Sequence, residues 1–319
     1  MSRYKEKPLS PAGLKTYPLH SRPSRVDVRS FARAFDPKDS FARFLDSLPG
    51  ILAGADFKAL VEALGRARRS GRAILFGLGA HVIKVGLNPV LIDLMDRGYV
   101  SGLALNGAGI IHDFEIALAG RTSEDVSLQM RSGRFGMARE TGEMLNEAIN
   151  RGDEDGLGLG EAVGRMVAAS RFPHRRVSLL GEAYRRGIPV TVHVALGTDT
   201  IHFHPRVDGA AIGRTSLRDF FLFCSLVRKL DRGGVYLNVG SAVILPEVFL
   251  KAASFVRNKG TRLEGFSTAV FDFNRHYRPA ENVARRPLGR KGRGFYFVGH
   301  HEIMIPLLAA ALKARRLKA

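Results

Sequence analysis

Residues 75–118 read LFGLGAHVIKVGLNPVLIDLMDRGYVSGLALNGAGIIHDFEIAL, and this stretch decides the fold class. Two short apolar runs, Ala73–Gly77 and Gly102–Leu105, stop at glycine-containing turns, as buried strands of a parallel sheet do. After each run, apolar residues recur three and four positions apart, at Pro89–Asp96 and Ile110–Ala119, which predicts two helices. The order strand, helix, strand, helix predicts a parallel sheet covered by helices.

The same alternation continues along the rest of the chain. Further helices are predicted at Phe41–Leu52, Phe57–Arg69, 135–149, 158–170, 177–186, Leu217–Leu230, Pro246–Arg257 and Ile303–Lys313. Further strands are predicted at Ile188–His193, Gly234–Val239, Gly265–Phe273 and Gly294–Val298. We therefore predict an α/β, Rossmann-like fold with a mostly parallel sheet and helices on both faces.

The domain organisation is expected to be simple. Residues 1–38 carry prolines at positions 8, 11, 18 and 23 and an excess of basic residues, so we expect an extended arm. Such an arm stays poorly ordered unless it docks on a neighbouring subunit. No linker-like composition interrupts residues 39–319, which we expect to form one domain.

The charge balance and the cysteine content narrow the possible partners. Lysine and arginine number 49 against 30 acidic residues, a net charge of +19, which attracts anionic partners. The basic residues are spread out and no RNA- or DNA-binding motif accompanies them, so nucleic-acid binding is not expected. The single cysteine, Cys224, excludes an internal disulfide. Without a membrane-spanning run or an apolar leader, we expect a cytoplasmic location and no membrane association.

Glycine-rich turns follow the first two predicted strands. They are Gly77-Leu-Gly79-Ala-His81 and Asn106-Gly107-Ala-Gly109, the second followed by His112 and Asp113. Glycine lets backbone N–H groups approach a phosphate, and the carboxyl ends of parallel strands are where such sheets bind ligands. Both turns lack the third glycine of the dinucleotide fingerprint, so glycines that serve only a tight turn are the alternative.

Two histidine-containing segments are further candidates. In Gly197–Pro205, the alternation of His202 and His204 predicts that both side chains lie on one strand face near Asp199, where they could bind a metal or a polar ligand. The segment 299–302, Gly-His-His-Glu, precedes the last helix. Its side chains could be ligands, an acid–base pair or a helix cap.

From residue 75 to 119 the sequence resembles the deoxyhypusine synthase family, and more closely its bacterial deoxyhypusine synthase-like branch. The resemblance continues in order over roughly residues 20–312, through the segments Ile188-Pro-Val, Gly197–His204, Gly234–Arg257, Arg278-Pro-x-Glu281-x-Val283 and Pro306-Leu-Leu308. It implies a Rossmann-like homotetramer with active sites shared across a dimer interface. In this family NAD accepts a hydride from spermidine. A lysine then carries the aminobutyl group as an imine and passes it to a lysine of a translation factor.

The chain departs from the family at the imine-forming lysine. The flanking motifs place that lysine at Pro287, whose side chain has no amine and cannot form an imine. Lys291, four residues further on, is the nearest substitute. By resemblance, Asp199 matches the aspartate that holds a substrate amine, and Glu281 belongs to a family motif.

The other departures introduce histidine. By resemblance, His81 stands for an asparagine, His112 for an acidic residue, and His300 for an aspartate that contacts the cofactor. Acidic groups suit a polyamine, whereas a basic, histidine-lined pocket suits an anionic small molecule. We therefore expect these three histidines to line a common pocket.

These observations lead to a set of hypotheses. The leading one is a divergent deoxyhypusine synthase-like protein, an NAD-binding transferase and homo-oligomer, that is not a genuine deoxyhypusine synthase. Its expected catalytic residues are Asp199, Glu281, Lys291 and His300; its expected cofactor contacts are Gly77, Gly79, His81, Asn106, Gly107, Gly109, His112 and Asp113. The alternatives are a non-catalytic oligomeric binding protein, a true synthase that uses Lys291, and a metal site built from His81, His112, His202, His204 or His300.

Overall fold

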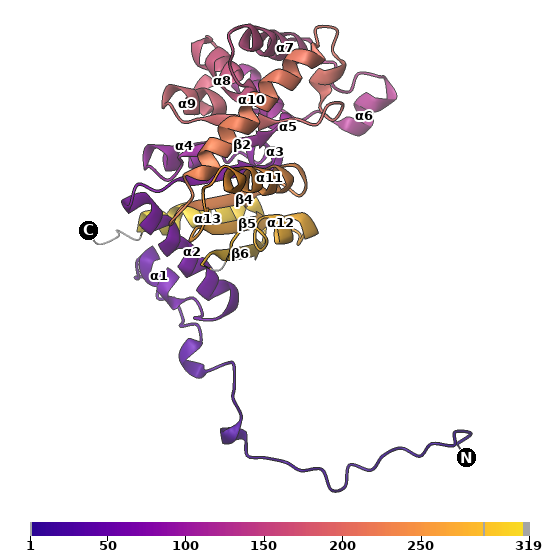
Figure 1. The fold of residues 1–319 in the computed structure, drawn as a ribbon, viewed down its shortest axis with the longest axis vertical. Coiled ribbons are helices and arrows are strands. Elements are labelled where there is room, and N and C mark those ends of the chain that lie inside the picture. The colour runs from indigo at the N-terminus through magenta and orange to yellow at the C-terminus, as the bar shows by residue number, and fades with distance from the viewer. Residues whose placement is uncertain (1, 290, 315–319) are drawn as a thin grey trace.

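The structure, a computed structural model, describes residues 2–289 and 291–314. Its centre is a six-stranded sheet in the order β3-β2-β1-β4-β5-β6, and every neighbouring pair is parallel (Figure 1). The strands are β1 (Ile74–Leu78), β2 (Gly102–Asn106), β3 (Val190–His193), β4 (Val235–Val239), β5 (Ser267–Asp272) and β6 (Arg293–Val298). The Rossmann-like prediction is confirmed, and the strand order reverses between β1 and β4, where such sheets form a ligand crevice.

Helices cover both faces of the sheet, as predicted. They are α1 (Phe41–Ser47), α2 (Leu52–Arg69), α3 (Ala80–Lys84), α4 (Asn88–Asp96), α5 (Gly107–Ala119), α6 (Val126–Arg131), α7 (Arg139–Glu154), α8 (Leu159–Ala169), α9 (Leu179–Arg185), α10 (Gly209–Arg228), α11 (Ile244–Asn258), α12 (Tyr277–Asn282) and α13 (His301–Ala314). Along β1, Ile74 and Phe76 join the core under α2, α5 and α13, whereas Leu75 joins the core under α10 and α11. Alternate side chains of this fully buried strand therefore belong to two separate hydrophobic cores.

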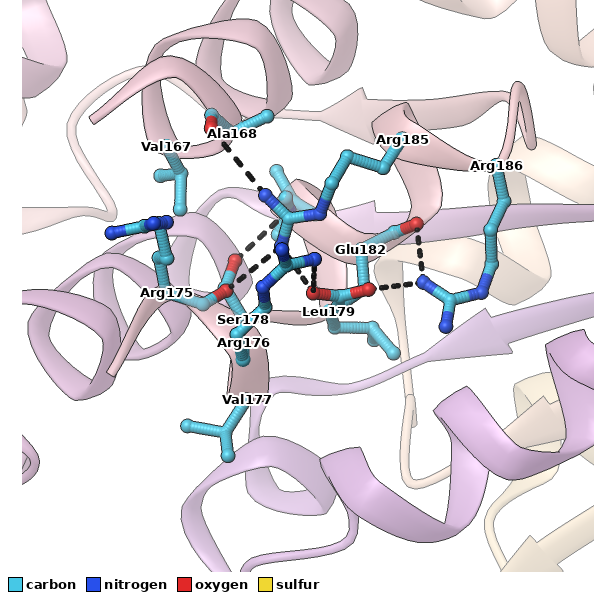
Figure 2. Close-up of polar contacts among 12 residues, drawn as sticks. Val167, Ala168, Arg175, Arg176, Val177, Ser178, Leu179, Glu182, Arg185 and Arg186 are labelled. Carbon is cyan, nitrogen blue, oxygen red and sulfur yellow. Dashed lines mark hydrogen bonds and ion pairs between the residues drawn. The ribbon is translucent and has the colours of Figure 1, made fainter. Parts of the chain in front are cut away.

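Helices α7 and α8 pack on α10 beyond the edge strand β3, and α9 packs on α8, with α6 beside the group (Figure 1). Ion pairs around the buried carboxylate of Glu182 connect these helices to α4, which packs near the sheet (Figure 2). Glu182, whose side chain is 5% exposed, pairs with Arg185 and Arg186 on and after α9 and lies 3.7 Å from Arg176. Arg186 also pairs with Asp96 at the end of α4, at 2.7 Å. This network fixes the position of α9, which immediately precedes β3.

Several local predictions were wrong: the first helix ends at Ser47 and the second begins at Leu52, and two further differences concern residues 199–217. The segment containing His202 is a 3₁₀-helix, η4 (Thr200–Phe203), and not a strand. The turn forms because Asp199 caps it, while His202 Nδ1 accepts hydrogen bonds from the backbone N–H groups of Gly197 (3.1 Å) and Asp199 (3.3 Å). Helix α10 begins at Gly209, well before the predicted Leu217, since Asp208 accepts from two N–H groups of its first turn.

Residues 2–38 run away from the body of the molecule as an extended segment with exposed side chains (Figure 1). The segment contains two short 3₁₀-turns, η1 (Leu19–Ser21) and η2 (Val28–Ser30). It meets the body where Ser30 accepts a hydrogen bond from Gly50 and Arg33 donates one to Ser47, both at 2.9 Å. Of the helices in the described ranges, none has the length and apolar character needed to cross a membrane.

Candidate functional site

The glycine turn after β1 is tightly packed. A Cβ at Gly77 would collide with the hydroxyl of Tyr236, and one at Gly79 would collide with the carbonyl of Gly240 in the turn after β4. Gly79 also donates its N–H to Val239 at 2.8 Å. Close approach of β4 and its turn therefore explains both glycines without a ligand, while His81 in the first turn of α3 remains exposed.

The second glycine turn holds a carboxylate. A Cβ at Gly107, the first residue of α5, would collide with Oδ2 of Asp199, and a Cβ at Gly109 would lie 3.3 Å from the side chain of Leu105. Oδ2 of Asp199 is buried and has no hydrogen-bond partner among the described residues, and Oδ1 of Asn106 is in the same state. Burial raises the pKa of Asp199. The turn thus brings a poorly solvated carboxyl group, distant in sequence, to the start of α5.

Asp113, nearly two turns into α5, faces the protein interior. It is fully buried and accepts hydrogen bonds from Asn88 (2.8 Å), Ser178 (2.5 Å) and the backbone N–H groups of Leu179 and Leu180 (2.7 and 3.1 Å). Since the first turn of α9 supplies two of these donors, Asp113 anchors α9 to α5. Asp113 therefore has a structural role and does not face a ligand.

A cavity of about 480 Å³ lies beside Asp199, between α5 and the segment leading into α7. Its charged lining comprises three carboxylates and two cations: Glu115, Glu124, Asp199, Lys84 and Arg121. His112, Thr122 and Thr141 also line it. Concave sites with a few convergent polar groups are where small ligands bind, and this one adjoins the carboxyl end of β2.

His112 belongs to a hydrogen-bonded chain in that cavity. Its Nδ1 lies 2.7 Å from Oγ1 of Thr122, which donates to Oε2 of Glu115 at 2.5 Å. Oγ1 of Thr141 donates to the other oxygen of Glu115 at 3.1 Å. Burial and the nearby Lys84 ammonium lower the pKa of His112 to about 4, so the ring is neutral at pH 7.

His81 and His300 lie in a second cluster, at the carboxyl ends of β1, β5 and β6. The ring centroids of His81 and His301 are 5.6 Å apart, and Phe273 lies 6.0 Å from His81 and 5.8 Å from His301. His300 stacks on Phe273 with an interplanar angle of 14°. His301 is buried, and its Nε2 lies 3.2 Å from the carbonyl oxygen of Phe271. Two of the three expected histidines therefore share a cluster, and the third, His112, lines the cavity on the other side of α3.

The metal hypothesis finds no support in the geometry. Across residues 2–289 and 291–314, no three His, Cys, Asp or Glu side chains are arranged to hold a metal ion. His202 lies 3.9 Å from Asp199 as part of the η4 cap, and His204 packs against Gly142 of α7. Both histidines therefore have structural partners.

The remaining candidates lie elsewhere. The carbonyl of Pro287 accepts a hydrogen bond from Arg257, at the amino ends of β5 and β6. Lys291 is exposed just before β6, so both residues occupy the edge of the sheet opposite the glycine turns. Glu281 on α12 forms an ion pair with Arg285 on the surface.

Sequence reasoning missed Phe273, Lys84, Thr122, Thr141 and Glu115. Only Glu115 carried a usable signal, because it stands three residues after His112 and such residues share a helix face. The two threonines approach this face from other segments. Their spacing along the chain gives no indication of that contact.

Comparisons with known proteins support the fold. No family model matches the chain, and no curated protein matches it. The solved arginine dihydrolase ArgZ, of the ornithine-ammonia cycle in cyanobacteria, is 19% identical with a TM-score of 0.51, over 83% of this chain and 32% of that one. AgrE, solved with ornithine and NAD+, is 17% identical with a TM-score of 0.51, over 81% of this chain and 33% of that one. The chain thus spans about a third of these two proteins.

A protein from Entamoeba histolytica described as a deoxyhypusine synthase matches over nearly its full length. It is 12% identical with a TM-score of 0.51, over 88% of this chain and 95% of that one. At such identities the likeness shows a shared fold, one found in NAD-binding and deoxyhypusine synthase-like proteins. It leaves the activity to be argued from the site itself.

Proposed function

We propose that this chain is a deoxyhypusine synthase-like, NAD-binding protein that takes a small amine into the cavity beside α5, and that it is not a deoxyhypusine synthase. The observation that carries the proposal is the carboxyl group of Asp199. It borders the cavity, and its buried Oδ2 accepts no hydrogen bond in the described chain, where Nε2 of His202 lies 3.9 Å away, beyond hydrogen-bonding distance. Buried acceptors without partners are costly, and a ligand ammonium group would supply the missing donor.

The charges of the cavity favour a cationic ligand over the anionic one expected from the histidines. Three carboxylates face two cations there. His112 adds no positive charge at neutral pH, because its pKa is lowered to about 4. An anion would meet Asp199 and Glu115 at close range, whereas an ammonium group would be attracted to them.

The carboxyl edge of the sheet has features that fit a dinucleotide. The strand order reverses beside the turns of Gly79 and Gly240, and the 46% exposed Phe273, with His81 and His300, offers surfaces on which a flat ring can stack. NAD, when bound, supplies a hydride acceptor for the amine-bearing carbon. Gly77, Gly79 and Gly107 do not belong to this dinucleotide site, because Tyr236, Gly240 and Asp199 fill the space beside them.

Transfer through an enzyme-bound imine is not part of the proposal. Pro287 lacks the required amine, and Lys291 lies at the opposite edge of the sheet from the cavity. An imine-forming lysine must reach the substrate carbon. We therefore propose that this chain retains amine binding and cofactor binding but has lost the transfer to a protein lysine.

We also propose that the chain is a homo-oligomer. Large exposed apolar side chains surround the carboxyl ends of β4, β5 and β6, namely Val243, Phe273, Tyr277, Val298 and Ile303. Contiguous exposed apolar surface usually marks an interface. Light scattering should give a mass above that of one chain, and Val298→Lys should lower it. A monomer at micromolar concentration would contradict this proposal.

The amine proposal is tested by direct binding measurements. Calorimetric titration with spermidine, putrescine and ornithine, with and without NAD+, should show amine binding that Asp199→Asn weakens about tenfold or more, the loss of one charge-assisted contact. NAD+ affinity should be retained in this variant. Asp155→Asn, a surface carboxylate remote from the cavity, is the matched control. If no amine and no NAD+ binds or raises the melting temperature at millimolar concentration, the proposal fails.

A further inference from the structure

The hydrogen-bonded chain that begins at His112 has a direction. The Thr122 hydroxyl carries one proton, and it gives that proton to Oε2 of Glu115 at 2.5 Å, because a carboxylate can only accept. The same hydroxyl lies 2.7 Å from Nδ1 of His112 and has only its lone pairs left for that contact. Nδ1 of His112 must therefore be the donor and carry the ring proton.

The second ring nitrogen is consequently an acceptor. Of the hydrogen bonds formed among residues 2–289 and 291–314, none involves Nε2 of His112, although the ring lines the cavity. A neutral histidine that is protonated on Nδ1 has its lone pair on Nε2. His112 is thus an uncharged base in the cavity. Its hydrogen-bond partner within the described chain contacts Nδ1, and Nε2 remains for a ligand.

We propose that Glu115 and Thr122 are positioning residues that hold His112 as the Nδ1–H tautomer, so that Nε2 is the hydrogen-bond and proton acceptor for a ligand in the cavity. The nature of the ligand rests on the proposed function. The arrangement selects a donor such as an ammonium group over a carboxylate, because a carboxylate would meet a second set of lone pairs. Thr141 completes the support by bonding the other oxygen of Glu115.

The proton transfer that follows is uphill, because the pKa of His112 is lowered to about 4, well below that of an ammonium group, so the transfer must be coupled to the loss of the hydride. A ligand N–H bond breaks, an Nε2–H bond forms on His112, and the electron pair stays on the ligand nitrogen. That nitrogen then has the lone pair it needs for the adjacent carbon to lose a hydride. The imidazolium produced is stabilised through Thr122 by the negative charge of Glu115.

Several charged groups face His112 and act on this step. Lys84 of α3 disfavours the imidazolium, and so does Arg121 in the loop after α5. Glu115 on the same helix, Glu124 in the loop and Asp199 before η4 favour it. A bound ammonium group adds a further positive charge until its proton moves, so binding itself keeps His112 neutral.

Nitrogen NMR of histidine-labelled protein tests the tautomer directly, without any ligand. At pH 7, His112 should show a protonated-type Nδ1 signal and an unprotonated-type Nε2 signal. Thr122→Val, which removes the hydroxyl but keeps the shape, should mix the two tautomers, and Thr122→Ser should restore the wild-type spectrum. Thr198→Val is the control, since Thr198 also lines the cavity but donates to Ala195. Its spectrum should keep the wild-type tautomer.

Binding measurements complete the test. Thr122→Val should weaken putrescine binding about tenfold, the cost of a misoriented acceptor, and Thr122→Ser should recover it. An Nε2–H tautomer in the wild-type spectrum would overturn the inference even if amines bind. The predicted tautomer in a protein that binds no amine would instead sink the proposed function and leave the positioning role of Glu115 and Thr122 standing.

Discussion

At the scale of single residues, Gly107 shows how a distant side chain dictates a residue type. The carboxyl group of Asp199 occupies the space that a Cβ at position 107 would need. A glycine-rich turn at a strand end suggests a phosphate cradle, but in this turn the same absence of a side chain accommodates a carboxylate of the chain itself. The position of Asp199, which also lines the cavity, therefore explains why residue 107 is glycine.

This packing predicts the effect of Gly107→Ala. The added methyl group must displace Asp199, so we expect a loss of about 1–3 kcal/mol in the free energy of unfolding and weaker amine binding. The control is Gly213→Ala in α10, where no neighbouring group lies within 4 Å of the place that the new methyl group would occupy. That change should be neutral or stabilising by up to about 1 kcal/mol. Urea unfolding of both variants measures the difference, and equal midpoints would contradict the explanation.

Part of the site could be predicted from sequence at this scale. Asp199 and His112 were identified because they stand in segments that resemble a known family, and both border the cavity. Thr122 and Thr141 could not be identified, since threonine is common and its contact with Glu115 depends on how the loop after α5 and helix α7 pack against α5. Lys291 was chosen for its proximity in sequence to Pro287, yet both residues lie at the amino edge of the sheet, opposite the cavity.

At the scale of elements, buried strands were the most predictable feature. Runs such as Ile74–Leu78 and Val235–Val239 are apolar throughout because both faces of a parallel sheet are covered. The helices α3, α6 and α12 were missed, since none exceeds six residues and a helical period cannot show over so short a length. The η4 turn was taken for a strand because alternation over three residues fits both structures.

The attachment of α9 predicts the effect of Glu182→Gln. This change removes the negative charge shared by Arg185 and Arg186 in a site where Glu182 is only 5% exposed (Figure 2). Because the arginines are partly solvated, we expect a cost of about 2 kcal/mol, below that of a fully buried pair. Glu147→Gln, which breaks an exposed pair with Arg151, should cost less than about 0.5 kcal/mol. Chemical denaturation compares them, and a cost for Glu182→Gln as small as that of the control would show that the network contributes little.

At the scale of the whole molecule, the two candidate regions lie along one edge of one sheet. The cavity adjoins the ends of β2 and β3, and the histidine cluster adjoins the ends of β1, β5 and β6. Helix α3 links them, since His81 belongs to the cluster and Lys84 to the cavity. A ligand in one region can therefore affect the other through a helix of little more than one turn.

Two buried groups give the whole molecule opposite responses to pH. Burial lowers the pKa of His193 to about 3, so the unfolded chain takes up this proton first and stability falls as pH drops below about 6.5. Burial raises the pKa of Asp219 to about 7, so its contribution is full below the unfolded pKa near 4 and is lost as pH rises toward 7. Each effect amounts to about 2 kcal/mol between pH 5 and pH 7, with opposite sign.

The partial cancellation predicts distinct pH profiles for two variants. In wild-type protein the free energy of unfolding should rise by about 1–2 kcal/mol from pH 5 to pH 7, because His112, whose pKa is also lowered to about 4, adds to the effect of His193 and the two together outweigh Asp219. His193→Gln leaves His112 to oppose Asp219, so stability should change little between pH 5 and pH 7, whereas Asp219→Asn leaves both histidines, so stability should increase more steeply than in the wild type. The measurement compares how the free energy of unfolding changes between pH 5 and pH 7. A packing defect that lowers stability equally at both pH values therefore does not affect the comparison. Parallel slopes for the two variants in urea titrations would show that neither group titrates differently in the folded chain.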